Sequence, residues 1–221
     1  MYENKIPSEP HGTLDELKKF RQLGSRIAGH PERELEIGVE TTTGPLGQGI
    51  ANAVGMAIAE AHQRAVFGDG IVSHWTYAIA GDGCMMEGVA SEAASLCGHL
   101  KLNNITLVYD DNGITIDGHT HLAFSDDVPK RFEAYGWNVL RVADVNDLPR
   151  LLHVMKQARG TKGRPTLVVA DSHIAWGVPG KQDHHSAHGE PLGWDAVKAA
   201  KAATAPTPTR RSTCRRRSMP R

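Results

Sequence analysis

The stretch that most constrains the fold runs from Thr76 to Gly83, where a short apolar segment ends abruptly in Gly81-Asp82-Gly83. A helical pattern begins at once, with apolar residues at three- and four-residue spacing: Met85, Met86, Val89, Ala93, Leu96 and Cys97. A second apolar run, Ile105–Tyr109, then stops at a polar segment, residues 110–113. Strand, turn, helix and strand in this order predict a βαβ unit with polar side chains at both strand ends.

The two predicted strand ends carry residues suited to a metal ion. Ligands of open parallel sheets bind beyond the carboxyl ends of the strands, so Asp82 and Asn112 should lie side by side. Their carboxylate and amide oxygens, with a backbone carbonyl, form the partial shell that Mg²⁺ accepts when phosphate oxygens complete its octahedron. The helix N-terminus after Gly83 adds amide donors for a phosphate. Gly-Asp-Gly by itself is weak evidence and favours an ordinary tight turn, but the second strand end shifts the balance towards a site.

The rest of the chain continues the alternation of strands and helices. Residues 50–64 predict a long amphipathic helix, and residues 14–23 a short one that begins with a capping box. Further on, residues 136–142 predict a strand, 146–158 a helix and 165–170 a buried strand. We therefore expect an α/β fold: a doubly wound, mainly parallel sheet with helices on both faces.

Two further segments could approach a ligand or serve only packing. The run Gly44-Pro45-Leu46-Gly47-Gln48-Gly49 precedes the long helix, but lacks the Lys-Ser/Thr of a Walker A loop and the spacing of Gly-x-Gly-x-x-Gly. Its glycines permit close approach, either of a ligand or of a neighbouring helix. His30 is held extended by Pro31, and either projects into a cleft or lies in a surface loop.

Three histidines, His184, His185 and His188, lie within five residues of one loop. A zinc site is one interpretation, although the spacing within a single loop and the lack of a fourth ligand disfavour it. A loop that closes over an anionic substrate is the better functional hypothesis, because imidazole donates hydrogen bonds and moves protons near neutral pH.

Composition narrows the setting and marks a tail. Three cysteines without metal-ligand spacing and the lack of a membrane-length apolar run favour a cytoplasmic protein without disulfides or membrane spans. Eight of the 25 basic residues and no acidic residue follow Asp195. We expect one partial α/β domain at 1–194 and a basic tail at 195–221 that is disordered or artefactual. Nucleic-acid binding by this tail is the weakest hypothesis.

Taken together, several blocks closely resemble transketolase, specifically the pyrophosphate-binding domain of its thiamine diphosphate fold. The resemblance extends from about residue 14 to about residue 193. It is carried by His30-Pro31-Glu32, by residues 38–57, by Gly81-Asp-Gly-Cys-Met-Met-Glu-Gly88, by Tyr109-Asp-Asp-Asn-Gly-Ile-Thr-Ile-Asp-Gly118 and by His188-Gly-Glu-Pro-Leu-Gly193.

The resemblance implies a metal and cofactor site. The metal, Mg²⁺ with Ca²⁺ or Mn²⁺ as substitutes, would be held by Asp82, Asn112 and the carbonyl of Ile114. Thiamine diphosphate would be contacted by Asn112, by the backbone of Gly83 at its diphosphate, and by Gly44, Pro45 and Leu46.

It also implies roles for two histidines and a glutamate. His188 would contact both cofactor and substrate, and His30 would face the donor sugar. Glu87 would lie near a homodimer contact. The reaction implied is transfer of a two-carbon ketol unit from a ketose phosphate to an aldose phosphate, in the pentose phosphate pathway, with the cofactor supplying carbanion stabilisation.

Some parts of the family pattern are not found in this sequence. About seventy N-terminal residues with two further histidines have no counterpart, nor does the pyrimidine-binding domain with its cofactor-activating glutamate. We therefore expect the isolated chain to be inactive. The alternatives are a non-catalytic cofactor-binding or heterodimerising remnant, the N-terminal subunit of a split thiamine-dependent enzyme, and the α subunit of a 2-oxo acid dehydrogenase, for which we see no phosphoserine-loop or lipoyl-partner features.

Overall fold

The fold is a four-stranded parallel sheet, seen in a computed structural model that describes residues 14–25, 27, 29–30, 32–35 and 38–204. The strands are β1 (Thr76–Gly81), β2 (Ile105–Asp111), β3 (Asn138–Val142) and β4 (Thr166–Asp171), in the order β1-β2-β4-β3. All three pairings are parallel. The predicted α/β class and parallel sheet are confirmed.

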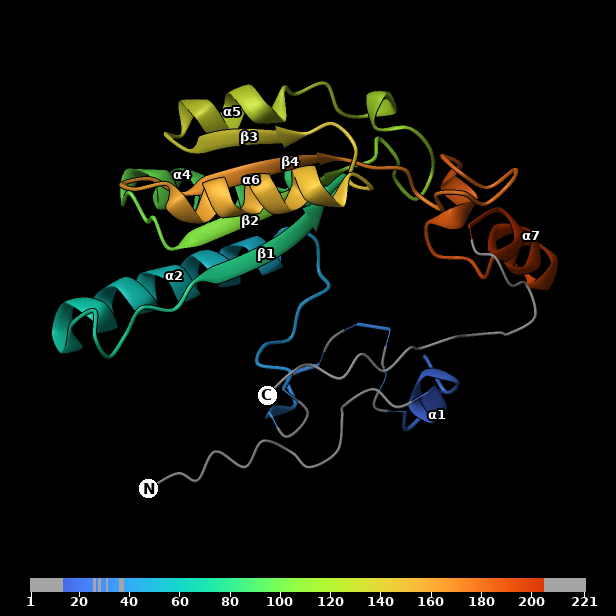
Figure 1. Cartoon of the computed structure of the whole chain (residues 1–221), viewed down its shortest axis with the longest axis horizontal. Helices are drawn as coiled ribbons and strands as arrows, with labels where there is room; N and C mark the ends of the chain where they lie inside the picture. Colours follow the sequence, from blue (N-terminus) through green and yellow to red (C-terminus); the bar gives the residue numbers. More distant parts are fainter. Residues whose placement is uncertain (1–13, 26, 28, 31, 36–37, 205–221) are drawn as a thin grey trace.

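Helices cover both faces of this sheet (Figure 1). On one face α2 (Gln48–Phe67), α4 (Gly88–His99) and α5 (Val128–Ala134) enclose the larger core with alternate residues of the central strands: Ile105, Leu107, Tyr109, Leu167 and Val169. On the other face α6 (Leu148–Gly160) packs against Val142 of β3 and Val168 of β4. The period-two alternation of side chains therefore distributes each strand between two cores.

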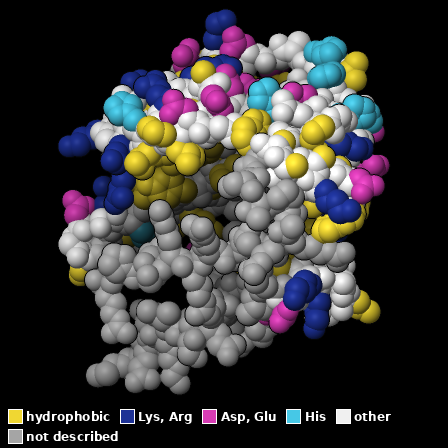
Figure 2. Space-filling view, turned by 45° about the vertical axis from the view of Figure 1, so that its right-hand side comes forward, with side chains coloured by type: hydrophobic (Ala, Val, Ile, Leu, Met, Phe, Trp, Pro, Cys, Tyr) yellow, Lys and Arg dark blue, Asp and Glu magenta, His cyan; other side chains and the backbone are white. Residues whose placement is uncertain are grey.

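The edge strand β1 is covered on one face only. Its residues Tyr77 and Ile79 are 50% and 79% exposed, whereas Ala80, which points to the α2 face, is buried. Figure 2 shows apolar side chains at the surface, some of them around a hollow. The outward face of β1 is therefore apolar and exposed to solvent.

A buried polar network fastens α2 to the amino end of the sheet. Glu60 is 1% exposed, pairs with Arg64 Nε at 3.2 Å, and accepts a hydrogen bond from Asn104 Nδ2. Asn104 also donates to the Ala57 carbonyl at 3.2 Å and accepts from the Thr76 amide at 2.8 Å. This network lies at the end of β1 and β2 opposite to Asp82, so its role is structural.

We expect Glu60→Gln to lower the free energy of unfolding by about 1–2 kcal/mol, because the amide keeps an acceptor for Asn104 but loses the ion pair with Arg64. Denaturant unfolding of the full chain measures this change. The same substitution at the exposed Glu92 of α4 is the control and should have no measurable effect. Equal stability of the two variants would show that the ion pair of Glu60 with Arg64 contributes nothing.

Helix α4 lies against the segment before β3 at Gly98. An added Cβ on Gly98 would lie 1.8 Å from the carbonyl oxygen of Tyr135, so only glycine fits there. The buried Trp137 fixes the same contact, since its Nε1 donates to the Ala94 carbonyl at 2.8 Å.

The structure differs from the sequence predictions in three elements. Helix α1 (Leu14–Leu17) ends well before residue 23. Phe20 and Leu23 are exposed, so these residues provide no packed face to sustain a longer helix. The predicted capping residue Thr13 lies outside the described residues. The helix expected after Gly83 is divided at Glu87, whose extended backbone separates α3 (Asp82–Met86) from α4.

The predicted tail is also partly wrong. Residues 194–204 form helix α7 (Trp194–Thr204), an alanine- and lysine-containing segment of good helix propensity, rather than disordered chain. Residues 205–221 lie outside the described part. Within the described ranges, no helix is both long and apolar enough to span a membrane.

Candidate metal and cofactor site

The centre of the site is Asp82, at the junction of β1 and α3. The register pairs Gly81 with Asp110, so the carboxyl ends of β1 and β2 lie next to each other. Asp82 is the first residue of α3 and is only 4% exposed. The strand-turn-helix pattern thus places a buried carboxylate at the position that the sequence predicted.

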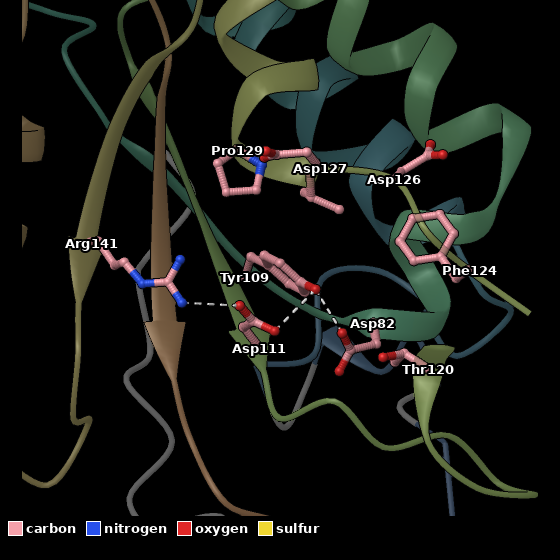
Figure 3. A pocket seen from close by; sticks show the side chains of 10 residues that line it. Asp82, Tyr109, Asp111, Thr120, Phe124, Asp126, Asp127, Pro129 and Arg141 are labelled. Carbon is pink, nitrogen blue, oxygen red and sulfur yellow. Dashed lines mark hydrogen bonds and ion pairs between the residues drawn. The ribbon is translucent and has the colours of Figure 1, made fainter. Parts of the chain in front are cut away.

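Three donors hold the Asp82 carboxylate. Oδ1 accepts the Tyr109 hydroxyl at 2.6 Å, which Figure 3 shows as a dashed line. Oδ2 accepts the backbone amides of Asn112 at 3.3 Å and Gly113 at 3.1 Å. All three donors are neutral, and among the described residues Asp82 takes part in no ion pair that would neutralise it.

Asn112 lies beside Asp82, as predicted, and is oriented by its neighbours. Its Oδ1 accepts the amide of Ile114 at 3.0 Å, and its Nδ2 donates to Asp110 Oδ2 at 3.2 Å. Asp110 is itself bonded to the Ser172 hydroxyl after β4. Since the amide nitrogen points to Asp110, the amide oxygen is directed towards the turn that contains Ile114, which is buried.

These groups fit a hard divalent cation. The donors gathered here are a carboxylate, a side-chain amide oxygen and a turn of backbone, which are the oxygen ligands that Mg²⁺ and Ca²⁺ take. A buried carboxylate held only by neutral donors also favours a positive partner. In the described ranges no three His, Cys, Asp or Glu residues are grouped for a metal, so these residues support neither the zinc interpretation of the histidine loop nor an all-acidic site.

The glycine-rich segment before α2 packs directly on the start of α3. An added Cβ on Gly83 would lie 3.3 Å from Leu46 Cδ1, and one on Gly47 would lie 2.7 Å from Glu87 Cβ. Gly47 has a φ of 76°, a left-handed conformation that glycine adopts without strain. The structure therefore brings Leu46 and Gly83 together, and the break of the helix at Glu87 accommodates this contact.

The predicted histidines lie in two different places. The His30 ring packs on Gly44, where an added Cβ would lie 2.7 Å from His30 Cδ2. His188 is exposed and follows a short 3₁₀ turn, His185–Ala187, in the segment that Figure 1 shows beyond the carboxyl end of β4. In the described part of the chain, no hydrogen bond or ion pair joins His188 to Asp82 or Asn112. Pro45 follows Gly44 in the exposed loop.

Sequence reasoning missed a cluster of charged and phenolic groups beside Asp82. A cavity of about 240 Å³ is bordered by Asp82, Tyr109, Asp111 and Arg141 (Figure 3). Arg141 of β3 pairs with Asp171 at 2.7 Å and with Asp111 at 3.6 Å. The available signal was strand alternation, which puts Tyr109 and Asp111 on the same face of β2.

Burial controls protonation in this cluster. Burial and the hydrogen bond to Asp82 raise the pKa of the Tyr109 phenol well above its ordinary value, so the hydroxyl keeps its proton and donates. Burial, reinforced by the Asp82 charge, also raises the pKa of Asp111, while Arg141 opposes this shift.

Comparison with known proteins gives consistent results. Residues 11–216 match the family described as transketolase, thiamine diphosphate binding domain. Transketolase of Geobacillus stearothermophilus is 52% identical over 194 residues, and transketolase 1 of Escherichia coli (strain K12) is 53% identical over 183 residues. These alignments cover 86% and 81% of this chain, but only 29% and 28% of the two relatives.

Solved structures agree with these relatives. Transketolase from Leishmania mexicana superposes with a TM-score of 0.83 at 49% identity, and a Pichia stipitis transketolase in complex with sedoheptulose 7-phosphate superposes with a TM-score of 0.82 at 44% identity. Each alignment covers 86% of this chain and 29% of the other. The chain thus spans less than a third of the length of the proteins that it matches.

Proposed function

The chain belongs to the transketolase family, and on that premise we propose that it is the part of a transketolase that binds the diphosphate of thiamine diphosphate through Mg²⁺. The observation that carries this proposal is the buried Asp82 carboxylate, held by neutral donors beside the Asn112 amide at the carboxyl edge of the sheet. A thiamine diphosphate-binding domain is shown by the family match, whereas the cation is inferred from these oxygens.

The proposed ligands of the cation are Asp82, Asn112 and the carbonyl of Ile114. Ca²⁺ or Mn²⁺ would substitute, since the donors are all oxygens. The N-terminus of α3 at Gly83 would donate backbone amides to the diphosphate. The contact of Leu46 with Gly83 supports a cofactor wall formed by Gly44, Pro45 and Leu46.

The whole protein would transfer a two-carbon ketol unit between sugar phosphates, a chemistry in which bound thiamine diphosphate stabilises carbanionic charge. The Pichia stipitis transketolase complex with sedoheptulose 7-phosphate supports substrates of this class. His30 beside Gly44 would face the donor sugar, and His188 would contact cofactor and substrate, with imidazoles moving protons at the sugar hydroxyls. We propose a homodimer with Glu87 near its contact, and a cytoplasmic location.

The relatives are much longer than this chain, and this bears on the activity expected of the chain alone. Because it covers 29% of the Geobacillus transketolase, we expect cofactor binding without turnover, with the pyrimidine-binding domain supplied by other sequence. The alternatives are one subunit of a split enzyme and a non-catalytic remnant. We propose a domain boundary near residue 194, where α7 begins, although the family match reaches residue 216.

Calorimetric titration of thiamine diphosphate into the purified chain tests the proposal. We expect saturable binding with Mg²⁺, none with excess chelator, and no conversion of sugar phosphates by the chain alone. Addition of the remaining portion of the Geobacillus relative should distinguish the two alternatives. Turnover of sugar phosphates by the mixture would support a split enzyme, whereas no turnover would support a non-catalytic remnant. A folded, soluble chain that does not bind the cofactor with Mg²⁺ would contradict the proposed function.

A further inference from the structure

The hydrogen bonds of Asp82 leave one position for a cation. A carboxylate offers about two acceptor positions on each oxygen. The amides of Asn112 and Gly113 take both positions on Oδ2, and the Tyr109 hydroxyl takes one on Oδ1. The remaining acceptor position of the carboxylate is therefore on Oδ1, the oxygen that the phenol holds.

Tyr109 is itself rigidly placed. It is 4% exposed, it belongs to the larger core, and the sheet register pairs it with Ala80, two residues before Asp82. A buried aromatic ring in the middle of a parallel sheet has little rotational freedom. Its hydroxyl is thus a fixed point from which the Asp82 carboxylate is oriented.

The phenol has a second acidic neighbour, which does not compete. Asp111 Oδ1 lies 3.4 Å from the Tyr109 hydroxyl, compared with 2.6 Å for Asp82 Oδ1. Asp111 also has a cationic neighbour in Arg141, at 3.6 Å. The single phenolic proton therefore goes to Asp82, the carboxylate that no ion pair of the described residues neutralises.

We propose that Tyr109 is a positioning residue: its hydroxyl fixes the Asp82 carboxylate so that the remaining acceptor position of Oδ1 faces the cation. This role rests on the proposed function, because it presumes that the cation binds at Asp82. The backbone amides of Asn112 and Gly113 hold Oδ2 in the same way, but only the phenol can be removed by substitution without moving the chain.

The test is Tyr109→Phe, which deletes one oxygen and keeps the buried ring. Removal of an outer partner of a metal ligand typically weakens metal affinity about 10- to 100-fold, and we expect that loss in calorimetric titrations of thiamine diphosphate with Mg²⁺. Tyr77→Phe removes the same oxygen from a half-exposed position on β1 and should bind within about twofold of the wild-type chain. Tyr109→Phe binding as tightly as Tyr77→Phe would overturn the positioning role.

A second measurement needs no cation and remains valid if Tyr109→Phe is less stable. Denaturant midpoints of the wild-type chain, Tyr109→Phe, Asp82→Ala and the double variant form a cycle that isolates the coupling of the two side chains, because alanine offers no partner to the phenol. We expect Tyr109→Phe to lower the midpoint more when residue 82 is aspartate than when it is alanine. Equal shifts in the two backgrounds would contradict the proposal.

The two proposals fail in different ways. A wild-type chain that does not bind thiamine diphosphate with Mg²⁺ overturns the cation site, and the positioning role with it. Wild-type binding that Tyr109→Phe leaves unchanged overturns the positioning role alone and leaves the proposed function intact.

Discussion

Asp82→Asn should abolish the Mg²⁺-dependent binding of thiamine diphosphate while the chain stays folded. The substitution removes the negative charge and replaces one carboxylate oxygen by a nitrogen that cannot bind a cation. We expect the affinity measured with Mg²⁺ to fall by more than about 100-fold, beyond the loss typical of an outer partner. Calorimetric titration with and without Mg²⁺ measures the change.

The hydrogen bonds at residue 82 explain why the variant should remain folded. The asparagine oxygen can accept the amides of Asn112 and Gly113, and its amide nitrogen can donate to the Tyr109 oxygen. The free energy of unfolding without a cation should therefore change by no more than about 1 kcal/mol. Asp117→Asn, at an exposed position of the following turn, is the matched control and should bind normally. Undiminished Mg²⁺-dependent binding by Asp82→Asn would remove Asp82 from the site.

Gly98→Ala should strongly destabilise the fold, because Gly98 lies where α4 contacts the segment before β3. The new Cβ would lie 1.8 Å from the Tyr135 carbonyl oxygen, a backbone atom that cannot rotate away. Either α4 or the segment before β3 must move, and the hydrogen bond from Trp137 to Ala94 is then strained or lost. We expect the free energy of unfolding to fall by about 3 kcal/mol or more, at the upper end of overpacking effects.

Gly55→Ala provides the opposite result as a control. Gly55 lies in the exposed part of α2, where an added Cβ meets nothing within 4 Å. Alanine is the better helix former there, so the variant should gain about 0.5–1 kcal/mol. Denaturant unfolding of both variants gives the sign and size of each change. Gain of stability by Gly98→Ala as well would mean that helix propensity outweighs the packing of α4.

Much of the fold followed from local patterns. The βαβ unit from Thr76 to Asp111, helix α6 and strand β4 were predicted within about three residues of their bounds, because apolar runs and periodic faces directly reflect burial. Helix α1 was predicted too long, because its later apolar residues Phe20 and Leu23 are exposed and sustain no packed face. Helix α7 was not predicted, although its segment has good helix propensity, because the basic composition of the tail favours disorder instead.

The candidate site shows the same division. Local sequence placed Asp82 and Asn112 at neighbouring strand ends, because parallel strands bring their carboxyl ends to one edge of the sheet. The packing of His30 on Gly44 and of Leu46 on Gly83 is not encoded in any local pattern, since the two members of each pair lie in different segments of the chain. The family resemblance alone suggested that these residues surround one site. The roles of these residues towards cofactor and sugar remain predictions.

The sequence by itself determined the order of strands and helices, the parallel class of the sheet and the oxygen-rich strand ends. Only the tertiary structure decided which oxygen of Asp82 stays available, that Tyr109 rather than another donor holds it, and that Arg141 of β3 neutralises Asp111 of β2. The physical reason is that periodicity encodes which side of an element is buried. Hydrogen bonds between side chains depend on the register and twist of elements that meet across the sheet, and those are properties of the whole fold.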